Sequence, residues 1–276
     1  MLLKDGIASI SDYATLKKHV SFSNIEEYSN RFLKTNDSNL EYYKKKWSKD
    51  PLHQWSREYE YPYVFQRVAD FLNTTSNSNV RILDAGSGVT FFPYLLKTKF
   101  NQVEVTCCDY DSELAPIYKK ISQYLSLNVD FYETDIHALP FKDASFDIVY
   151  CISVLEHTRD YAKVLDEFKR VLKPGGTLIV TFDISVDGKT DISIEKAEFL
   201  LNDINQRFIL ESKVEKISQA DFSKKLTTAY FKNTRPELLP WRFSIKSFAK
   251  ELLKFNISTS KFFNLAFYCV SAKKSL

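Results

Sequence analysis

The central part of the chain alternates between short apolar runs and longer amphipathic stretches. The apolar runs predict strands at residues 80–83, 103–108, 128–133, 146–152 and 176–182. Between them, a helical period predicts helices at residues 91–99, 113–125 and 160–172. Such alternation, with nearly continuous apolar strands, is typical of a doubly wound, mostly parallel α/β sheet with helices on both faces.

The regions on either side of this alternation follow other patterns. Residues 1–78 predict a helical N-terminal cap that ends in a turn-rich loop, NTTSNSN. Within the cap, residues 47–63 are dense in aromatic side chains, which indicates a packed cover, although each aromatic could equally be an ordinary anchor. We assign residues 79–276 to the main domain.

The last third of the chain is less regular. A helix is predicted at 194–208 and a basic amphipathic helix at 245–255, within an insertion that spans residues 184–262. Residues 265–273 form an apolar run that fits a final edge strand.

Composition indicates an ordinary globular protein. Of the 276 residues, 44% are apolar and 26% charged, which excludes bulk disorder. The N-terminus lacks a signal-peptide core and no apolar stretch is long enough to span a bilayer, so we expect a cytoplasmic protein. All four cysteines, without CxxC spacing, are expected to be buried thiols rather than disulfides or zinc ligands: Cys107, Cys108, Cys151 and Cys269.

Charge is spread unevenly along the chain. From residue 222 onward, nine Lys and two Arg face two Glu, which leaves +9 in the tail and −6 in the rest of a chain of net charge +3. A basic tail favours phosphate-bearing or anionic partners and leaves peripheral membrane contact open. A solvated basic face without a partner is an equal alternative.

Glycines mark a candidate ligand site. Gly86 and Gly88 lie between the first strand and the following helix, in ILDAGSG, where doubly wound sheets bind ligands. A dinucleotide fingerprint requires a third glycine, but Phe91 stands there, and no Gly-Lys-Ser/Thr follows as in a phosphate-binding loop. The motif therefore disfavours a pyrophosphate ligand.

Three acidic residues narrow the choice of ligand. Asp84 precedes the glycines, where it would repel a pyrophosphate and suit a cation. Asp109, 21 residues beyond Gly88, ends the second strand, where a carboxylate can accept hydrogen bonds from ribose hydroxyls. Asp135 follows the third strand and could accept from an adenine amino group. Together they indicate a positively charged nucleoside without phosphate, such as S-adenosylmethionine.

Five ordered motifs, ILDAGSG, CCDYD, ETDIHALPF, FDIVYCISVLEHT and LKPGGTLIVTF, lie within residues 79–183. Their order and spacing resemble the class I S-adenosylmethionine-dependent methyltransferases of the small-molecule branch. The resemblance implies a seven-stranded Rossmann-like sheet with an antiparallel last strand at 265–273. It also implies that Gly86 and Gly88 pass under the cofactor, that Asp109 holds the ribose, and that Asp135 and the Ile136 backbone meet the adenine.

Further positions complete the predicted cofactor site. We assign Ser87, Tyr110 and Ser153 to it from their places in the motifs. Arg57 and Tyr61, in the aromatic segment, are predicted to close over the methionine carboxylate of the cofactor.

Glu156 and His157, which follow the fourth strand, are the catalytic candidates. An imidazole with an ordinary pKa near 6.5 suits a general base at neutral pH. The alternative is that both residues cap the next helix or pair with each other. Two ligands are too few to claim a divalent metal, so we predict no metal site.

The sequence therefore predicts an S-adenosylmethionine-dependent methyltransferase. We favour O-methylation of a small carbohydrate-type, sugar-linked or phosphorylated metabolite. A nucleic-acid methyltransferase is disfavoured because the body is acidic and no recognition module is added, so no nucleic-acid partner is expected. A methyltransferase-like module that binds the cofactor without turnover is the remaining alternative.

Overall fold

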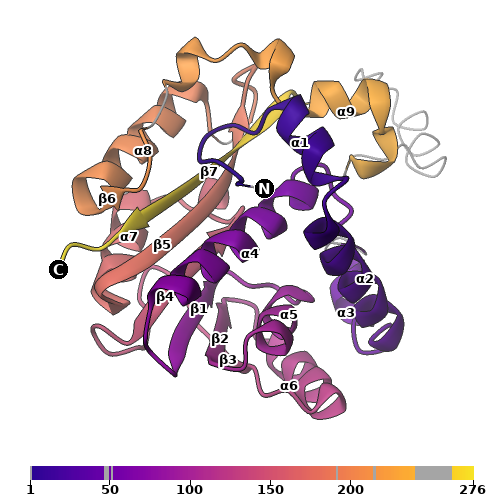
Figure 1. Ribbon diagram of the computed structural model, residues 1–276, viewed down its shortest axis with the longest axis vertical. Helices are drawn as coiled ribbons and strands as arrows, with labels where there is room; N and C mark the ends of the chain where they lie inside the picture. Colours follow the sequence, from indigo (N-terminus) through magenta and orange to yellow (C-terminus); the bar gives the residue numbers. More distant parts are fainter. Residues whose placement is uncertain (1, 47–49, 51, 191, 214–215, 240–262) are drawn as a thin grey trace, which may run out of the picture.

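A seven-stranded sheet in the order β3-β2-β1-β4-β5-β7-β6 forms the centre of the molecule (Figure 1). The computed structural model describes residues 2–46, 50, 52–190, 192–213, 216–239 and 263–276. The strands are β1 Val80–Ala85, β2 Val103–Asp109, β3 Asp130–Glu133, β4 Phe146–Ile152, β5 Leu172–Ser185, β6 Ile209–Leu210 and β7 Leu265–Lys273.

Strands β1 to β5 are mutually parallel, and β7 runs antiparallel between β5 and β6. The β5–β7 pairing extends without interruption from Thr177↔Lys273 to Ser185↔Leu265. The predicted doubly wound sheet and its antiparallel last strand are thus confirmed. Strand β6 was missed because its two residues are too short to show a period.

Four predicted helices lie among the described residues, and each begins and ends within about two residues of its predicted bounds. The helices of the structure are α1 Ile10–Leu16, α2 Val20–Thr35, α3 Glu41–Lys46, α4 Arg57–Thr74, α5 Phe92–Lys99, α6 Leu114–Leu125, α7 Tyr161–Val171, α8 Ile194–Arg207 and α9 Thr228–Thr234. Short 3₁₀ turns are η1 Leu155–His157, η2 Ile217–Gln219, η3 Phe222–Lys224 and η4 Pro236–Leu238. The predicted basic helix at 245–255 lies outside the described residues.

Two apolar cores lie on the two faces of the sheet. Helices α1, α2, α4, α5 and α6 contribute to one core, and α7 and α8 contribute to the other. Because side chains alternate along a strand, the neighbouring thiols Cys107 and Cys108 enter opposite cores. All four cysteines are buried and free, as predicted, and burial raises the pKa of each thiol.

The N-terminal region packs directly on the sheet. Helix α4 contacts β4, β5 and β7, and Gly6 forms a two-hydrogen-bond bridge with Cys269 of β7, with N–O distances of 2.7 and 3.0 Å. Arg67 also pairs with Asp5 at 2.9 Å. The predicted cap therefore shares its core with the main domain, and the division at residue 78 stays a prediction.

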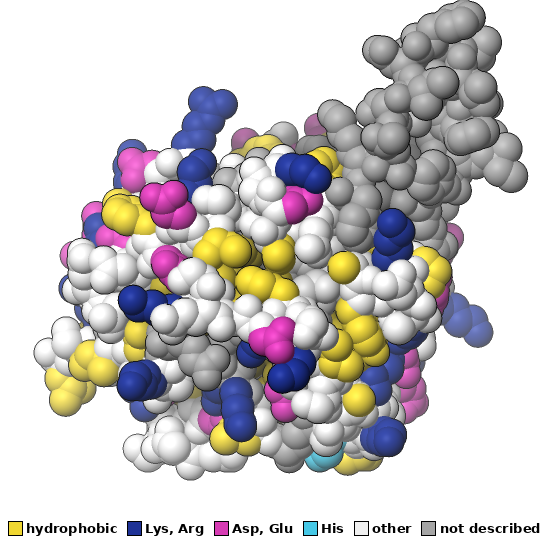
Figure 2. Space-filling model, turned by 90° about the horizontal axis from the view of Figure 1, so that it is seen from above, with side chains coloured by type: hydrophobic (Ala, Val, Ile, Leu, Met, Phe, Trp, Pro, Cys, Tyr) yellow, Lys and Arg dark blue, Asp and Glu magenta, His cyan; other side chains and the backbone are white. Residues whose placement is uncertain are grey.

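Much of the positive charge described in the C-terminal tail is paired within the fold. Lys224 pairs with Asp221, and Lys273 pairs with Glu211. On the face seen in Figure 2, basic and acidic side chains are interspersed with hydrophobic ones. Among the described residues, no helix combines the length and apolar character needed to cross a bilayer.

Candidate functional site

The loop after β1 requires glycine at two positions. Gly86 has φ of +75°, and a Cβ there would lie 2.6 Å from a methyl carbon of Val154. Gly88 has φ of +51°, and a Cβ there would lie 2.5 Å from the hydroxyl of Tyr43. Both distances are far below van der Waals contact, so a larger residue would displace the loop or its neighbours.

Asp109 ties this loop to the end of β2. Its Oδ2 accepts a hydrogen bond from the Gly88 N–H at 2.9 Å, and its Oδ1 accepts one from the Asp111 N–H at 3.1 Å. The Tyr118 hydroxyl donates a hydrogen bond to the Gly88 carbonyl at 2.8 Å. A carboxylate has about four acceptor sites, so Asp109 can still accept hydrogen bonds from a ligand.

A cavity of about 630 Å³ opens over this loop at the carboxyl ends of the strands. Its volume lies within the range usual for ligand sites. The structure brings eleven of the thirteen predicted site residues to its wall: Arg57, Tyr61, Gly86, Ser87, Gly88, Asp109, Tyr110, Asp135, Ile136, Ser153 and His157.

Asp84 does not reach the cavity wall. Its carboxyl group is buried below the loop, where its Oδ2 accepts a hydrogen bond from the Tyr150 hydroxyl at 2.8 Å. Burial raises the pKa of Asp84 to about 8. At neutral pH this group is largely uncharged, so its position does not support the predicted direct contact with a cationic ligand.

Glu156 also lies outside the cavity wall. Both of its carboxyl oxygens are buried, and neither has a hydrogen-bond partner among the described residues. Burial and the neighbouring Asp183 raise the pKa of Glu156 well above its usual range. Because both oxygens are buried away from the cavity, they cannot reach a substrate there, so the structure does not support the catalytic role predicted for Glu156.

Arg57 is held at the edge of the cavity by a buried network. It donates hydrogen bonds to Glu60 and Ser153, and the Ser153 hydroxyl donates to Glu60 at 2.8 Å. Burial opposes the charge of Arg57, but the surrounding acids outweigh it and raise the pKa of the guanidinium. A cation held by these hydrogen bonds therefore lies in the wall of the cavity, where it could meet an anionic group of a ligand.

Asp135 is partly committed to its own turn. Its Oδ1 accepts from the His137 N–H at 2.9 Å and lies 2.6 Å from His137 Nδ1. These hydrogen bonds lower the pKa of Asp135, so the carboxylate stays charged. Its second oxygen can still accept a hydrogen bond from a ligand at the cavity wall.

Sequence reasoning missed several residues of the wall, above all Tyr43. Its hydroxyl lies against Gly88, and burial raises its pKa to about 12. Tyr43 belongs to the charged segment EYYKKK, just before the aromatic stretch that was taken as a cover. The other wall residues that were not predicted are Gln54, Thr90, Thr134, His137, Ile152, Val154, Thr158 and Arg159.

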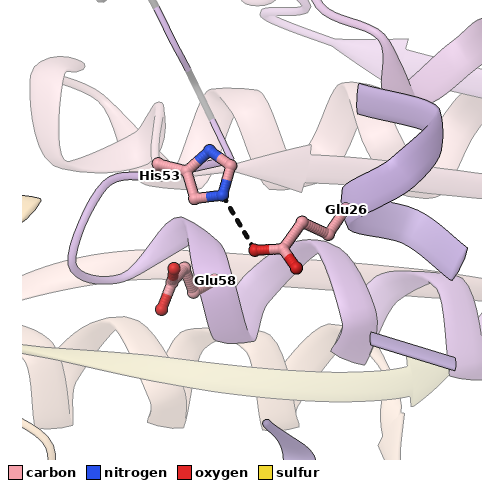
Figure 3. A group of neighbouring side chains, drawn as sticks. All are labelled: Glu26, His53 and Glu58. Carbon is pink, nitrogen blue, oxygen red and sulfur yellow. Dashed lines mark hydrogen bonds and ion pairs between the residues drawn. The ribbon is translucent and has the colours of Figure 1, made fainter. Parts of the chain in front are cut away.

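A separate group beneath the N-terminal helices resembles a metal site. Possible ligand atoms of Glu26, His53 and Glu58 lie within 4.8 Å of one another, and His53 turns its Nε2 toward Glu26 (Figure 3). Both ring nitrogens of His53 are already paired, one with Glu26 at 3.0 Å and the other with Asp50.

Basic side chains of the protein already form ion pairs with this group. Lys17 lies 3.2 Å from Glu58, and Arg235 lies 3.1 Å from the same carboxylate. A hydrogen bond to Asp50 raises the pKa of His53 to about 9, even though burial opposes the charge. A protonated imidazole offers no lone pair to a metal, so we interpret the group as an ionic network that joins α1, α2, α4 and η4.

Comparison with known proteins identifies the type of domain. Residues 83–180 match the family model described as a methyltransferase domain. A demethylmenaquinone methyltransferase of Deinococcus radiodurans is 34% identical over 114 residues, which cover 41% of this chain and 47% of that protein. The corresponding protein of Thermus thermophilus is 37% identical over 100 residues, 36% of this chain and 46% of that protein. The chain thus spans about half the length of these curated relatives.

Solved structures share the fold over a larger part of the chain. The [4+2]-cyclase SpnF has a TM-score of 0.53 at 22% identity and covers 83% of this chain and 86% of its own. A geranyl diphosphate C-methyltransferase from Streptomyces coelicolor, solved with S-adenosyl-L-homocysteine, has a TM-score of 0.54 at 12% identity and covers 77% of this chain and 79% of its own. At these identities the likeness concerns the fold alone.

Replacing Gly86 with Ala tests the steric role of the loop. We expect Gly86→Ala to weaken binding of S-adenosylhomocysteine at least tenfold, because the new Cβ meets Val154 and shifts the loop. Gly188→Ala is the matched control: Gly188 has a similar φ of +70° but no atom within 4 Å of its Cβ position. Isothermal titration calorimetry of both variants provides the measurement, and equal affinities would contradict the steric role.

The ionic network predicts a pH-dependent contribution of His53 to stability. Since its pKa is raised from 6.5 to about 9 on folding, this contribution is complete below pH 6.5 and is lost as pH rises through 9. After allowance for partial exposure we expect His53→Gln to lower the unfolding free energy by about 1–2 kcal/mol near pH 6. Urea denaturation should show this difference shrinking as pH rises from about 6.5 to 9 and largely absent above pH 9; a constant difference would exclude an ionic role.

Proposed function

We propose that the chain is a class I S-adenosylmethionine-dependent methyltransferase that transfers a methyl group from the cofactor to a small-molecule acceptor, in keeping with the match of residues 83–180 to a methyltransferase domain. The observation that carries the proposal is the cavity in which a glycine loop, the Asp109 carboxylate and the Arg57 guanidinium meet. This cavity is open to solvent, and acidic side chains at the strand ends line it. Such a lining favours a ligand that carries no phosphate group.

The residues of the wall fit the cofactor. Asp109 would hold the ribose, and Asp135 with Ile136 would meet the adenine. Arg57 would face the methionine carboxylate, with Gly86 and Gly88 providing close access to the backbone. When bound, the cofactor supplies a methyl group on a positively charged sulfur, which an acceptor lone pair can displace.

The protein contributes to methyl transfer mainly by aligning the cofactor and the acceptor. The rigid loop, fixed by Asp109 and Tyr118, and the anchored Arg57 leave little freedom to the groups that position the reactants. Orienting two reactants in this way can lower a barrier by roughly 7–11 kcal/mol. An acceptor hydroxyl must in addition lose its proton.

We assign His157 as the side chain that accepts that proton. It is exposed at the end of η1 and lines both the cofactor cavity and a second groove beside it. An imidazole on this boundary can accept the proton of an acceptor that enters from the groove. This supports O-methylation, and we retain a carbohydrate-type or phosphorylated metabolite as the favoured acceptor class.

Binding of S-adenosylhomocysteine tests the cofactor assignment. We expect wild-type protein to bind it, and Asp109→Asn to bind it about tenfold or more weakly, because a charge-assisted hydrogen bond to ribose is lost. Asp130→Asn, an exposed carboxylate at the opposite end of β3, serves as the control and should bind normally. If the wild-type protein bound neither S-adenosylhomocysteine nor S-adenosylmethionine, the proposed function would be wrong.

Replacing His157 tests the proton acceptor. We expect His157→Gln to lower kcat about 10²–10⁴-fold on a hydroxyl acceptor found in a panel assay of homocysteine release. The limb of the pH–rate profile that reports imidazole deprotonation should also disappear. His19→Gln, on the distant helix α2 cap, is the control. An unchanged pH profile in His157→Gln would exclude His157 as the base.

A further inference from the structure

A second cavity of about 840 Å³ lies beside the cofactor cavity. The two share His157, Thr158 and Arg159, which connect η1 to α7. The remaining lining residues come from η1 and from the beginnings of α7 and α8: Glu156, Tyr161, Ser193, Glu195, Lys196 and Phe199. We refer to this cavity as the α7–α8 groove. A molecule in it would reach the cofactor cavity past His157.

The charge of the α7–α8 groove is positive. The side chains of Arg159 and Lys196 belong to exposed residues, and neither forms an ion pair with any residue that the structure describes. The exposed acid of the lining is Glu195, since both carboxyl oxygens of Glu156 are buried and turned away from solvent. Elsewhere, by contrast, cations such as Arg207 and Arg170 are held by neighbouring acids.

The helices add to this preference for negative charge. The α7–α8 groove lies at the N-terminal ends of α7 and α8, where the helix dipoles are positive. Asp160 and Ser193 cap these helices through the amides of Lys163 and Lys196, and Asp160 does not line the groove. The Asp160 carboxylate offsets the dipole of α7, so the contribution comes from the N-terminal end of α8, which the uncharged Ser193 caps beside Lys196.

An apolar surface adjoins the two cations. Phe199 lies three residues after Lys196 on α8, so both side chains lie on one face of the helix. Phe199 is 65% exposed, so its ring is accessible to a ligand in the groove. Tyr161 contributes a second aromatic residue from α7. The uncharged part of a ligand can pack against these rings.

We propose that the α7–α8 groove binds the methyl acceptor, and that Arg159 and Lys196 hold an anionic group on it, a phosphate or a carboxylate. This inference rests on the proposed function and specifies its acceptor class. Arg159 provides planar paired donors suited to either oxyanion, and Lys196 provides a mobile ammonium group. The acceptor's reacting hydroxyl would then lie toward His157, and its uncharged body against Phe199 and Tyr161.

Anion binding by the loaded protein tests this inference. Protein saturated with S-adenosylhomocysteine is titrated calorimetrically with inorganic pyrophosphate and, separately, with citrate at constant ionic strength. We expect wild-type protein to bind at least one of them, and the preferred anion distinguishes phosphate from carboxylate recognition. Lys196→Ala should weaken this binding at least fivefold and Lys196→Glu should abolish it, whereas Lys196→Arg should retain it.

Two comparisons separate the outcomes. Lys196 lines only the α7–α8 groove, so Lys196→Ala should leave S-adenosylhomocysteine binding unchanged. Lys120→Ala, an exposed lysine on α6, removes one charge elsewhere and should bind the anion normally. If loaded wild-type protein binds neither anion, or Lys196→Ala binds as wild type does, the groove assignment is overturned while the cofactor assignment stands. Failure of S-adenosylhomocysteine itself to bind overturns the proposed function.

Discussion

The site depends on the lack of a side chain at two positions of one loop. Gly86 lies against Val154 and Gly88 against Tyr43, so the loop is enclosed by elements far apart in the sequence. The hydrogen bond from Gly88 to Asp109 then fixes this loop to the neighbouring strand. Since the parallel strands end at the same edge, one steric constraint aligns the loop, the strand-end acids and Arg57 around a single cavity.

Most of the fold could be predicted because the strands of a parallel sheet are buried on both faces. The apolar run 146–152 therefore marks β4 to the residue, whereas β5 extends from Leu172 to Ser185, beyond the predicted 176–182, because its ends are not continuously apolar. Strand β6 could not be found, because two residues carry no periodic signal and its pairing depends on β7. Helix α2 was covered only by the general prediction of a helical N-terminal cap, since its buried side chains are scattered among many polar ones.

The position of the cavity was predictable for the same reason, because strand ends place Asp109 and Asp135 at one edge. Whether a side chain at these positions faces the cavity or the interior was not predictable. Asp84 and Glu156 occupy motif positions next to the cavity, yet both carboxyl groups face the interior, where burial favours the neutral form. Tyr43 and Arg159 contribute through tertiary packing and lie outside the glycine and aspartate pattern that identified the site. The groove proposed to bind the acceptor is likewise formed only where α7 and α8 lie next to each other.

A crystal structure of the protein with S-adenosylhomocysteine tests the central claim most directly. The account predicts that the ribose hydroxyls bond Asp109, that the adenine lies beside Ile136, and that the carboxylate of the ligand meets Arg57. The Gly86–Gly88 backbone should run directly beneath the ligand. A ligand bound elsewhere, or a ribose without contact to Asp109, would contradict the assignment of this cavity as the cofactor site.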